Sequence, residues 1–207
     1  MQTILETFSA SFEEKKSTFL AYLCPIQAFE SLHVRLKNEH PKAAHIVWAK
    51  RFFNEYRQIV ENNSDDGEPK GTSGPPVLNV MRGAELVEVG LLIVRYFGGI
   101  KLGTGGLVRA YGSSAKEVIA HATLHPFVFK ETLTCKTAYP LVPRFEHYTS
   151  HQGLHVKGRA FENDGVLWEL ELSEAEKEDF LRFAIVFERD GFFLKHQGCV
   201  GTLPKRT

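Results

Sequence analysis

The first half of the chain is organised around one apolar stretch, Val87-Glu88-Val89-Gly90-Leu91-Leu92-Ile93-Val94-Arg95-Tyr96. It is rich in β-branched residues and flanked by glycines, which predicts a central strand buried on both faces. A glycine-rich segment over 98–106 follows. Beyond it, apolar residues recur at helical spacing: Leu107, Val108, Tyr111, Ala115, Val118, Ile119 and Ala122. We therefore expect a central strand that leads through a glycine-rich loop into an amphipathic helix.

Further strands and helices are expected upstream of this strand. The residue pattern predicts strands over 4–12, 17–23, 44–53 and 56–60. Pro25 suits the first turn of a helix, and the apolar residues after it share one helical face: Ile26, Phe29, Leu32 and Leu36. Residues 62–76 are dominated by Gly, Pro, Asp and Ser and predict a long loop. A short helix is expected over 77–81.

The pattern breaks at His125-Pro126 and then starts again. It predicts a strand over 128–137, a helix over 142–150, strands over 154–161 and 166–172, a helix over 174–188 and a strand over 193–200. This βαββαβ order is the ferredoxin-like plan. Ser173 and Glu176 have the spacing of a capping box at the start of the last helix. The sequence thus predicts an α+β protein of two domains, 1–126 and 127–207.

Composition excludes several classes of protein. The 207 residues include 25 basic and 25 acidic side chains, so the formal net charge is zero and any site for nucleic acid has to be a local patch. The three cysteines are widely separated, as expected of reduced thiols in the cytoplasm. The chain starts without the pattern of a signal peptide, and its most apolar run is too short to span a membrane. No membrane partner is expected.

The glycine-rich segment is the strongest candidate for binding. Backbone N–H groups at a helix N-terminus can hold an anion, with Lys101 and Arg109 adding positive charge and Thr104 contacting the anion or capping the helix. Basic and aromatic residues before the loop are suited to stacking on unpaired bases. Neither the dinucleotide nor the P-loop fingerprint fits, and no cofactor is expected. The candidate residues are Arg95, Tyr96, Phe97, Gly98, Gly99, Lys101, Gly103, Thr104, Gly105 and Arg109.

A second candidate is the acidic loop, which carries Asp65, Asp66 and Glu68. Three carboxylates this close are able to hold a hard cation, but they lack the spacing of an EF-hand. They are also able to pair with Arg51 or Arg95 and fix the loop. His45 lies in a predicted strand near Arg51 and is included among the binding candidates. The remaining histidines and the cysteines predict no zinc site, and no residue fits a known nucleophile motif.

Three stretches together resemble the IMPACT/YigZ family: 44–51, 65–74, and 90–106 with Val94-Arg95-Tyr96-Phe97-Gly98-Gly99 at its centre. The resemblance covers about residues 1–125. It implies a ribosomal-protein-like first domain, shared with the fourth domain of elongation factor G, with a left-handed βαβ crossover. The second half is similar to the last domain of elongation factor G. Lys50 departs from the family, in which an aromatic residue is common at that position, so a stacking role there is not expected.

The residues and the resemblance favour a cytoplasmic, translation-associated binding protein. Its contact face would be the segment from Arg95 to Arg109 with the acidic loop, and its partner would be RNA, the ribosome or a protein regulator of translation. Two alternatives stay open. One is an enzyme that acts on a small phosphorylated or peptidic substrate in a cleft at the glycine-rich loop. The other is a pure protein-interaction module. No catalytic residue is assigned from the sequence.

Overall fold

The apolar stretch forms strand β6 (Val89–Tyr96) at the centre of a five-stranded sheet. In this computed structural model, which describes residues 1–195, every residue from Val89 to Arg95 is buried. The strand order is β2-β3-β6-β4-β5, and each neighbouring pair is antiparallel. The other four strands are β2 (Phe8–Glu14), β3 (Ser17–Pro25), β4 (His45–Phe53) and β5 (Ile59–Ser64). The prediction of a central strand buried on both faces is confirmed.

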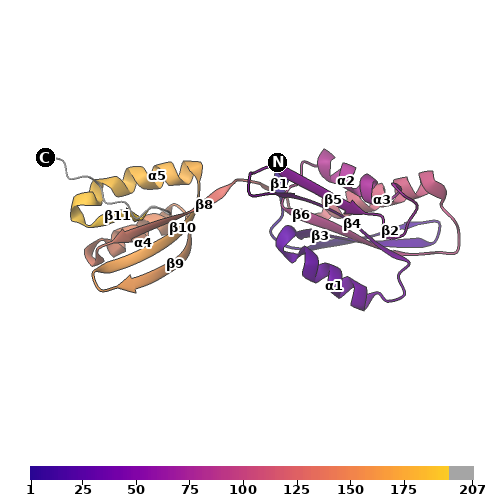
Figure 1. Cartoon of the computed structure of the whole chain (residues 1–207), viewed down its shortest axis with the longest axis horizontal. Coiled ribbons are helices and arrows are strands. Elements are labelled where there is room, and N and C mark those ends of the chain that lie inside the picture. The colour runs from indigo at the N-terminus through magenta and orange to yellow at the C-terminus, as the bar shows by residue number, and fades with distance from the viewer. Residues whose placement is uncertain (196–207) are drawn as a thin grey trace. The chain divides into compact units, whose positions relative to one another are not determined.

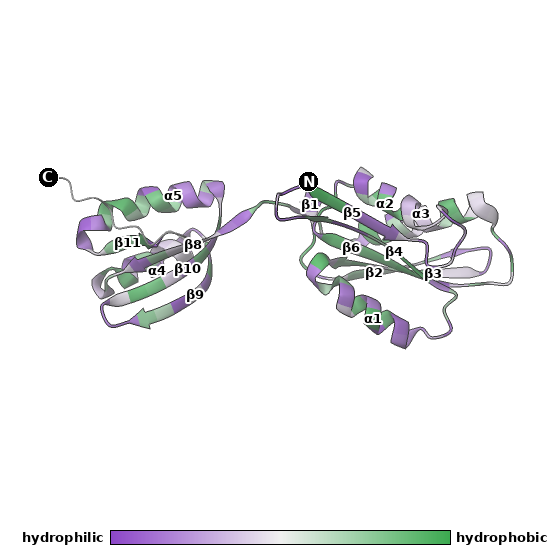
Figure 2. Cartoon of the chain, in the orientation of Figure 1, coloured by the Kyte–Doolittle hydropathy of each residue, from purple (hydrophilic) through white to green (hydrophobic). Residues whose placement is uncertain are grey.

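Helices cover both faces of this sheet, as Figures 1 and 2 show. The helix α1 (Phe29–Glu39), preceded by the short η1 (Ile26–Ala28), packs on one face over Leu92 and Val94. The helices α2 (Gly74–Gly83) and α3 (Gly103–His121) pack on the other face over Leu91 and Ile93. Successive side chains of β6 therefore alternate between the α1 face and the α2–α3 face.

The sheet contains two crossovers of opposite hand. β3 and β4 are both antiparallel to β6, so they are parallel to each other, and α1 connects them on one face. β5 and β6 are both antiparallel to β4, and α2 connects them on the other face. The β3–β4 connection and the β5–β6 connection cross the sheet in opposite directions. The strands β3 and β4 also point opposite to the strands β5 and β6. Because their helices lie on opposite faces, one crossover is necessarily left-handed, against the usual preference.

Several boundaries differ from those expected. The predicted strand over 56–60 begins only at Ile59, because residues 54–58 form a turn in which Asn54 Oδ1 accepts the N–H groups of Tyr56 and Gln58. The predicted loop over 62–76 is shorter, since β5 extends to Ser64 and α2 starts at Gly74 with prolines in its first turn. Val108 was expected on the apolar stripe of α3 but is 40% exposed.

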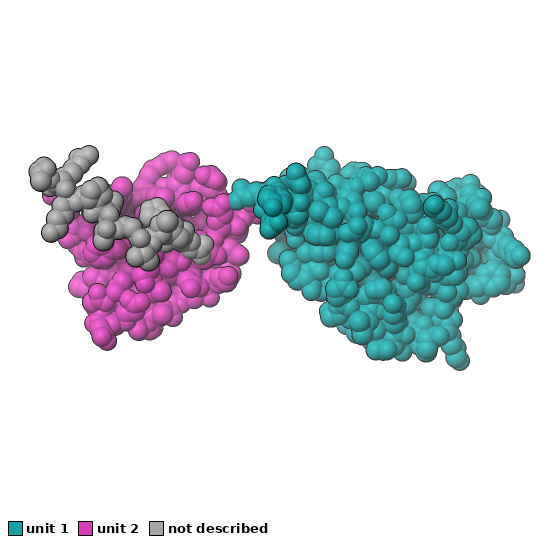
Figure 3. Space-filling view, viewed as in Figure 1, with its two compact units in different colours: residues 1–127 teal, residues 128–207 magenta. Residues whose placement is uncertain are grey.

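The chain divides into two compact units, residues 1–127 and residues 128–207, coloured separately in Figure 3. Within the first unit, the two-residue strand β1 (Gln2–Thr3) pairs with β7 (His125–Pro126), so the beginning and the end of this unit are joined. Across the described residues, no helix combines the length and apolar character needed to span a membrane.

The second unit has a four-stranded antiparallel sheet in the order β11-β8-β10-β9. Its elements are β8 (Lys130–Thr137), η2 (Tyr139–Leu141), α4 (Val142–His151), β9 (His155–Glu162), β10 (Gly165–Ser173), α5 (Glu174–Ala184), η3 (Ile185–Asp190) and β11 (Phe192–Lys195). The expected βαββαβ element order is present, and the capping box of Ser173 and Glu176 forms as predicted. The helix expected to reach residue 188 gives way to η3 after Ala184, and the end of the strand expected over 193–200 lies outside the described residues.

Candidate functional site

A pocket of about 470 Å³ lies in the first unit, beside the first turn of α3. It brings together residues of three separate segments that the sequence singled out: His45, Glu68, and the stretch from Arg95 to Thr104. The complete lining is Ala44, His45, Glu68, Pro69, Arg95, Phe97, Lys101, Leu102, Gly103, Thr104 and Leu107. We call this cavity the α3 pocket.

A buried ion pair lies against this pocket. Arg95 Nη1 donates to Glu68 Oε1 at 2.5 Å, and the Tyr111 hydroxyl donates to the same oxygen at 2.8 Å. The side chains of Arg95 and Glu68 are only 7% and 3% exposed. Burial, together with the neighbouring Glu68 charge, raises the pKa of the Tyr111 phenol, which keeps this group protonated as a donor. Arg95 is thus paired with the acidic loop and is not the free surface cation that a phosphate contact would need.

His45 lies next to Arg95 because the two residues are directly opposite each other in the register of β4 and β6. Its Nδ1 is 2.7 Å from the carbonyl oxygen of Asp66. A carbonyl only accepts, so Nδ1 carries the proton of the neutral ring. Its Nε2 faces Glu68 Oε2 at 3.9 Å.

The acidic loop is held by its own carboxylates. Asp65 Oδ1 accepts from the Ser73 hydroxyl at 2.7 Å and from the backbone N–H of Gly74 at 2.9 Å, while Oδ2 accepts from Gly71 N–H at 2.7 Å. Burial opposes ionisation of Asp65, but these hydrogen bonds outweigh it and hold the pKa below its usual range. Asp66 Oδ2 accepts from Ile46 N–H at 2.6 Å. These carboxylates therefore serve to fix the loop rather than to gather around a cation.

Two of the sequence-predicted binding residues lie elsewhere. Arg51 Nε donates a hydrogen bond to Glu61 Oε1 at 2.8 Å, and its Nη1 donates to the carbonyl oxygen of Leu86 at 2.7 Å. Arg51 is therefore part of the packing beneath α2. Tyr96 follows Arg95 and therefore points to the opposite face of the sheet, where its hydroxyl is 2.8 Å from His40 Nδ1. Neither residue lines the α3 pocket.

The glycine-rich loop passes over the hairpin between β2 and β3. A Cβ on Gly98 would lie 2.0 Å from the Lys16 carbonyl, so only glycine fits there, and the Gly98 N–H donates to Ser17 Oγ at 3.2 Å. The turn formed by Lys15 and Lys16 is thereby brought against the loop. Sequence reasoning missed these two lysines, since nothing in the local pattern places one hairpin turn beside a loop some eighty residues away.

The outer edge of the site is cationic and aromatic. Phe97 is 52% exposed, and the Arg95 guanidinium lies 5.8 Å from its ring centre. Lys101 and Arg109 are exposed, and an Arg109 nitrogen is 3.6 Å from the position of a Cβ on Gly105, so this side chain turns back towards the helix start. Thr104 does not cap α3, which begins at Gly103, but lies in its first turn. Gly99 and Gly103 adopt φ of +85° and +73° and give the loop its shape.

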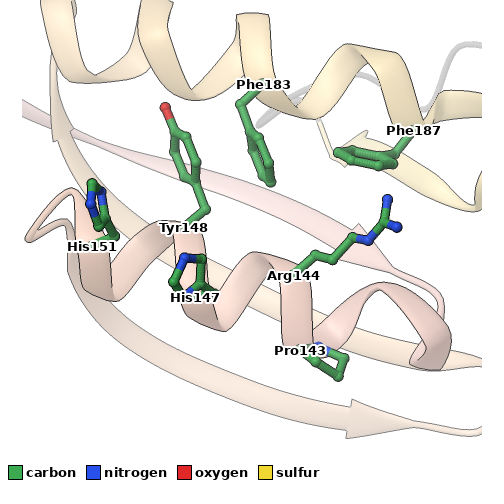
Figure 4. A pocket seen from close by; sticks show the side chains of 7 residues that line it. All are labelled: Pro143, Arg144, His147, Tyr148, His151, Phe183 and Phe187. Carbon is green, nitrogen blue, oxygen red and sulfur yellow. The ribbon is translucent and has the colours of Figure 1, made fainter.

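The second unit has a separate apolar groove, shown in Figure 4. Its volume is about 550 Å³, and it lies between α4 and the segment formed by α5 and η3. Tyr148 and Phe183 stack with ring centres 3.8 Å apart, and the Arg144 guanidinium lies 5.6 Å from the ring centre of Phe187. The other lining residues are Pro143, His147 and His151. The sequence had given no signal for this groove beyond the helical spacing of its aromatic residues.

Comparison with known proteins identifies the family of this chain. The family model of the Impact N-terminal domain matches residues 15–119, which include the whole α3 pocket. An IMPACT family member of Haemophilus influenzae is 43% identical over 113 residues, which cover 52% of this chain and 55% of that protein. An IMPACT family member of Thermus thermophilus is 36% identical over 159 residues, which cover 76% of this chain and 85% of that protein.

The likeness to the Haemophilus protein thus spans little more than half of that relative's length. Among solved structures, the crystal structure of a protein described as hypothetical aligns with a TM-score of 0.65 at 28% identity, and covers 93% of this chain and 95% of that one. The match of the family model to half of the chain and the likeness to the Thermus protein agree with the resemblance found in the sequence, and the chain belongs to the IMPACT family.

Proposed function

We propose that this protein binds RNA as a cytoplasmic, translation-associated factor, and that it uses the surface around the α3 pocket. The observation that carries the proposal is the combination of exposed cations and an exposed aromatic ring at the N-terminus of a long helix. We call this surface the α3 face and define it by Lys15, Lys16, Phe97, Lys101 and Arg109.

Charge supports a phosphate-bearing partner. The chain has no net charge, so a binding site for a polyanion depends on local cations. Four of the five residues of the α3 face are cationic, and the first N–H groups of the 19-residue α3 add the positive end of its helix dipole. Arg95 and Glu68 neutralise each other in the interior and leave this surface potential unchanged.

The fold supports the ribosome as the RNA to test first. We infer that the first unit has the ribosomal-protein-like fold that the resemblance implies, since one of its two crossovers is left-handed. We infer likewise that the second unit is ferredoxin-like, since its strands follow the order β11-β8-β10-β9. The first plan was expected from the family resemblance, and the second from the βαββαβ element order.

The test is co-sedimentation of the full chain with ribosomes at about 50 mM and 200 mM salt, the range over which phosphate contacts weaken strongly. The variant Lys101→Ala/Arg109→Ala should reduce binding and lower the salt slope by about 0.7 to 0.9 for each lost contact. Its matched control is Arg35→Ala/Lys37→Ala, which removes the same two types of cation from α1 on the opposite face of the sheet. Equal binding of the α3-face variant and the wild type at low salt would contradict the proposal.

A protein partner is the second candidate, and the apolar groove of the second unit favours it. Exposed apolar surface of this kind is typical of protein contacts. If the Lys101→Ala/Arg109→Ala variant binds ribosomes like the wild type, a protein partner becomes the first candidate.

A further inference from the structure

We propose that the α3 pocket binds one unpaired nucleotide, with its base against Phe97 and its phosphate at the first turn of α3. The inference rests on the proposed RNA binding, because the nucleotide would belong to that RNA. It goes further by naming the unit that is recognised and the residues that recognise it.

The size and walls of the pocket suit a nucleotide. Its volume of about 470 Å³ lies within the range of small-molecule sites. Pro69, Leu102 and Leu107 supply apolar wall, as the flat faces of a base and a ribose require. A free phosphate ion would use little of this surface, and a base in a duplex would have to be unpaired and unstacked, at a cost in free energy, to enter the pocket.

An aromatic side chain stands at the pocket in a position to stack. Phe97 lines the pocket and is nevertheless 52% exposed, so one part of its ring is free for a ligand. The Arg95 guanidinium lies 5.8 Å from the centre of this ring and fixes its position from within the unit. Stacking of a base on an aromatic ring contributes about 5- to 150-fold in affinity.

Unused hydrogen-bonding capacity beside the pocket is a second, independent observation. Arg95 Nε is fully buried and has no hydrogen-bond partner among the residues that the structure describes. Glu68 uses Oε1 for Arg95 and Tyr111, whereas its Oε2 lies 3.9 Å from His45 Nε2, beyond hydrogen-bond distance. Buried polar groups are rarely left unpaired. Both residues line the pocket, and the edge of a nucleobase, which presents donors and acceptors together, is able to use this capacity.

The phosphate position follows from the start of α3. Gly103 and Thr104 line the pocket and are the first two residues of α3, so their N–H groups have no partner within the helix. Lys101 also lines the pocket. A helix N-terminus with a nearby lysine is suited to a phosphate group. The pocket therefore offers a place for the base and a place for the phosphate within one cavity.

The first experiment compares single-stranded and duplex RNA of the same length, with affinity measured by fluorescence anisotropy on the full chain. Phe97→Leu keeps an apolar side chain but removes the ring. We expect it to weaken single-stranded binding about 5- to 150-fold and to leave duplex binding and the salt slope unchanged. The matched control is Phe161→Leu, which removes an exposed phenylalanine, 72% accessible, from the second unit.

The second experiment titrates the four nucleoside 5′-monophosphates, adenosine and inorganic phosphate into the full chain, with backbone amide NMR signals of Gly99 and Gly103 as the readout. Nucleotides should shift these signals at lower concentration than adenosine or phosphate alone, and Phe97→Leu should remove that difference. If phosphate is as effective as the nucleotides, the pocket is a simple anion site and the inference is wrong. Absence of any shift would also overturn it.

The two proposals fail in different ways. If Phe97→Leu binds single-stranded RNA like the wild type while Lys101→Ala/Arg109→Ala loses ribosome binding, the nucleotide pocket is refuted and the RNA-binding function stands. If the chain binds neither ribosomes nor single-stranded RNA but takes up mononucleotides in a manner that depends on Phe97, the RNA-binding function is refuted and the pocket stands.

Discussion

Replacement of Glu68 by glutamine should destabilise the first unit strongly. The Arg95–Glu68 pair is 7% and 3% exposed, so water cannot take over the interactions of either side chain. Loss of one partner from a buried pair costs about 3–5 kcal/mol, because the other charge stays behind uncompensated. The hydrogen bond from Tyr111 to the same oxygen is weakened at the same time. For a unit of this size, the change corresponds to a decrease in Tm of roughly 10–20 °C.

Urea unfolding followed by fluorescence measures this loss. The chain has two tryptophans, Trp48 in the first unit and Trp168 in the second, so Trp168→Phe provides a background in which only the first unit is observed. The matched control is Glu30→Gln, since Glu30 pairs with Lys50 at 3.1 Å but is 76% exposed, and an exposed pair contributes at most about 1 kcal/mol.

Two outcomes decide whether the reasoning holds. A free energy of unfolding for Glu68→Gln within about 1 kcal/mol of the wild type would refute it, because a truly buried pair cannot be broken at so small a cost. The double variant Glu68→Gln/Arg95→Gln removes both charges, and we expect it to recover part of the stability that the single variant loses.

Two further predictions concern the loops. The pKa of Asp65 is lowered in the folded state, so its contribution to stability is complete above its unfolded pKa and is lost as pH falls through the folded value. Asp65→Asn should therefore lower the free energy of unfolding at pH 7. Urea titrations should show that the difference in this free energy between variant and wild type shrinks towards pH 2. Gly98→Ala would place a Cβ 2.0 Å from the Lys16 carbonyl and should cost about 1–3 kcal/mol. Gly83→Ala, with no atom within 4 Å of the new Cβ, should leave Tm unchanged, and equal Tm values for the two alanine variants would contradict the steric argument.

Local sequence signals predicted the elements that they determine by themselves. The β-branched run correctly predicted β6, and the spacing of Phe29, Leu32 and Leu36 predicted the buried side of α1. The capping box of Ser173 and Glu176 predicted the start of α5. The strands β1 and β7 were not predicted as a pair. Each has two residues, and their pairing depends on contacts between the two ends of the unit, which no local pattern encodes.

The candidate site was predicted only in part, because local patterns do not encode contacts between distant segments. His45, Glu68 and Arg95 were named from chemistry, and the pairing of Arg95 with the acidic loop was one of the two options considered. The sequence predicted Tyr111 only as a core residue of α3, because helical spacing does not indicate the hydrogen-bond partner of its hydroxyl group. Tyr96 does not line the α3 pocket, and the sequence already indicated this. Neighbours in a strand face opposite sides, so Arg95 and Tyr96 cannot both line one pocket.

The central position of β6 also has a consequence for synthesis of the protein. Both of its partners, β3 and β4, precede it in the chain, and the hairpins β2–β3 and β4–β5 are complete by Ser64. Until residues 89–96 leave the ribosome, each hairpin keeps an unpaired edge with open N–H and C=O groups, which other chains are able to pair with. Insertion of β6 saturates both edges in a single step. The nascent first unit is therefore most exposed to aggregation just before this strand emerges.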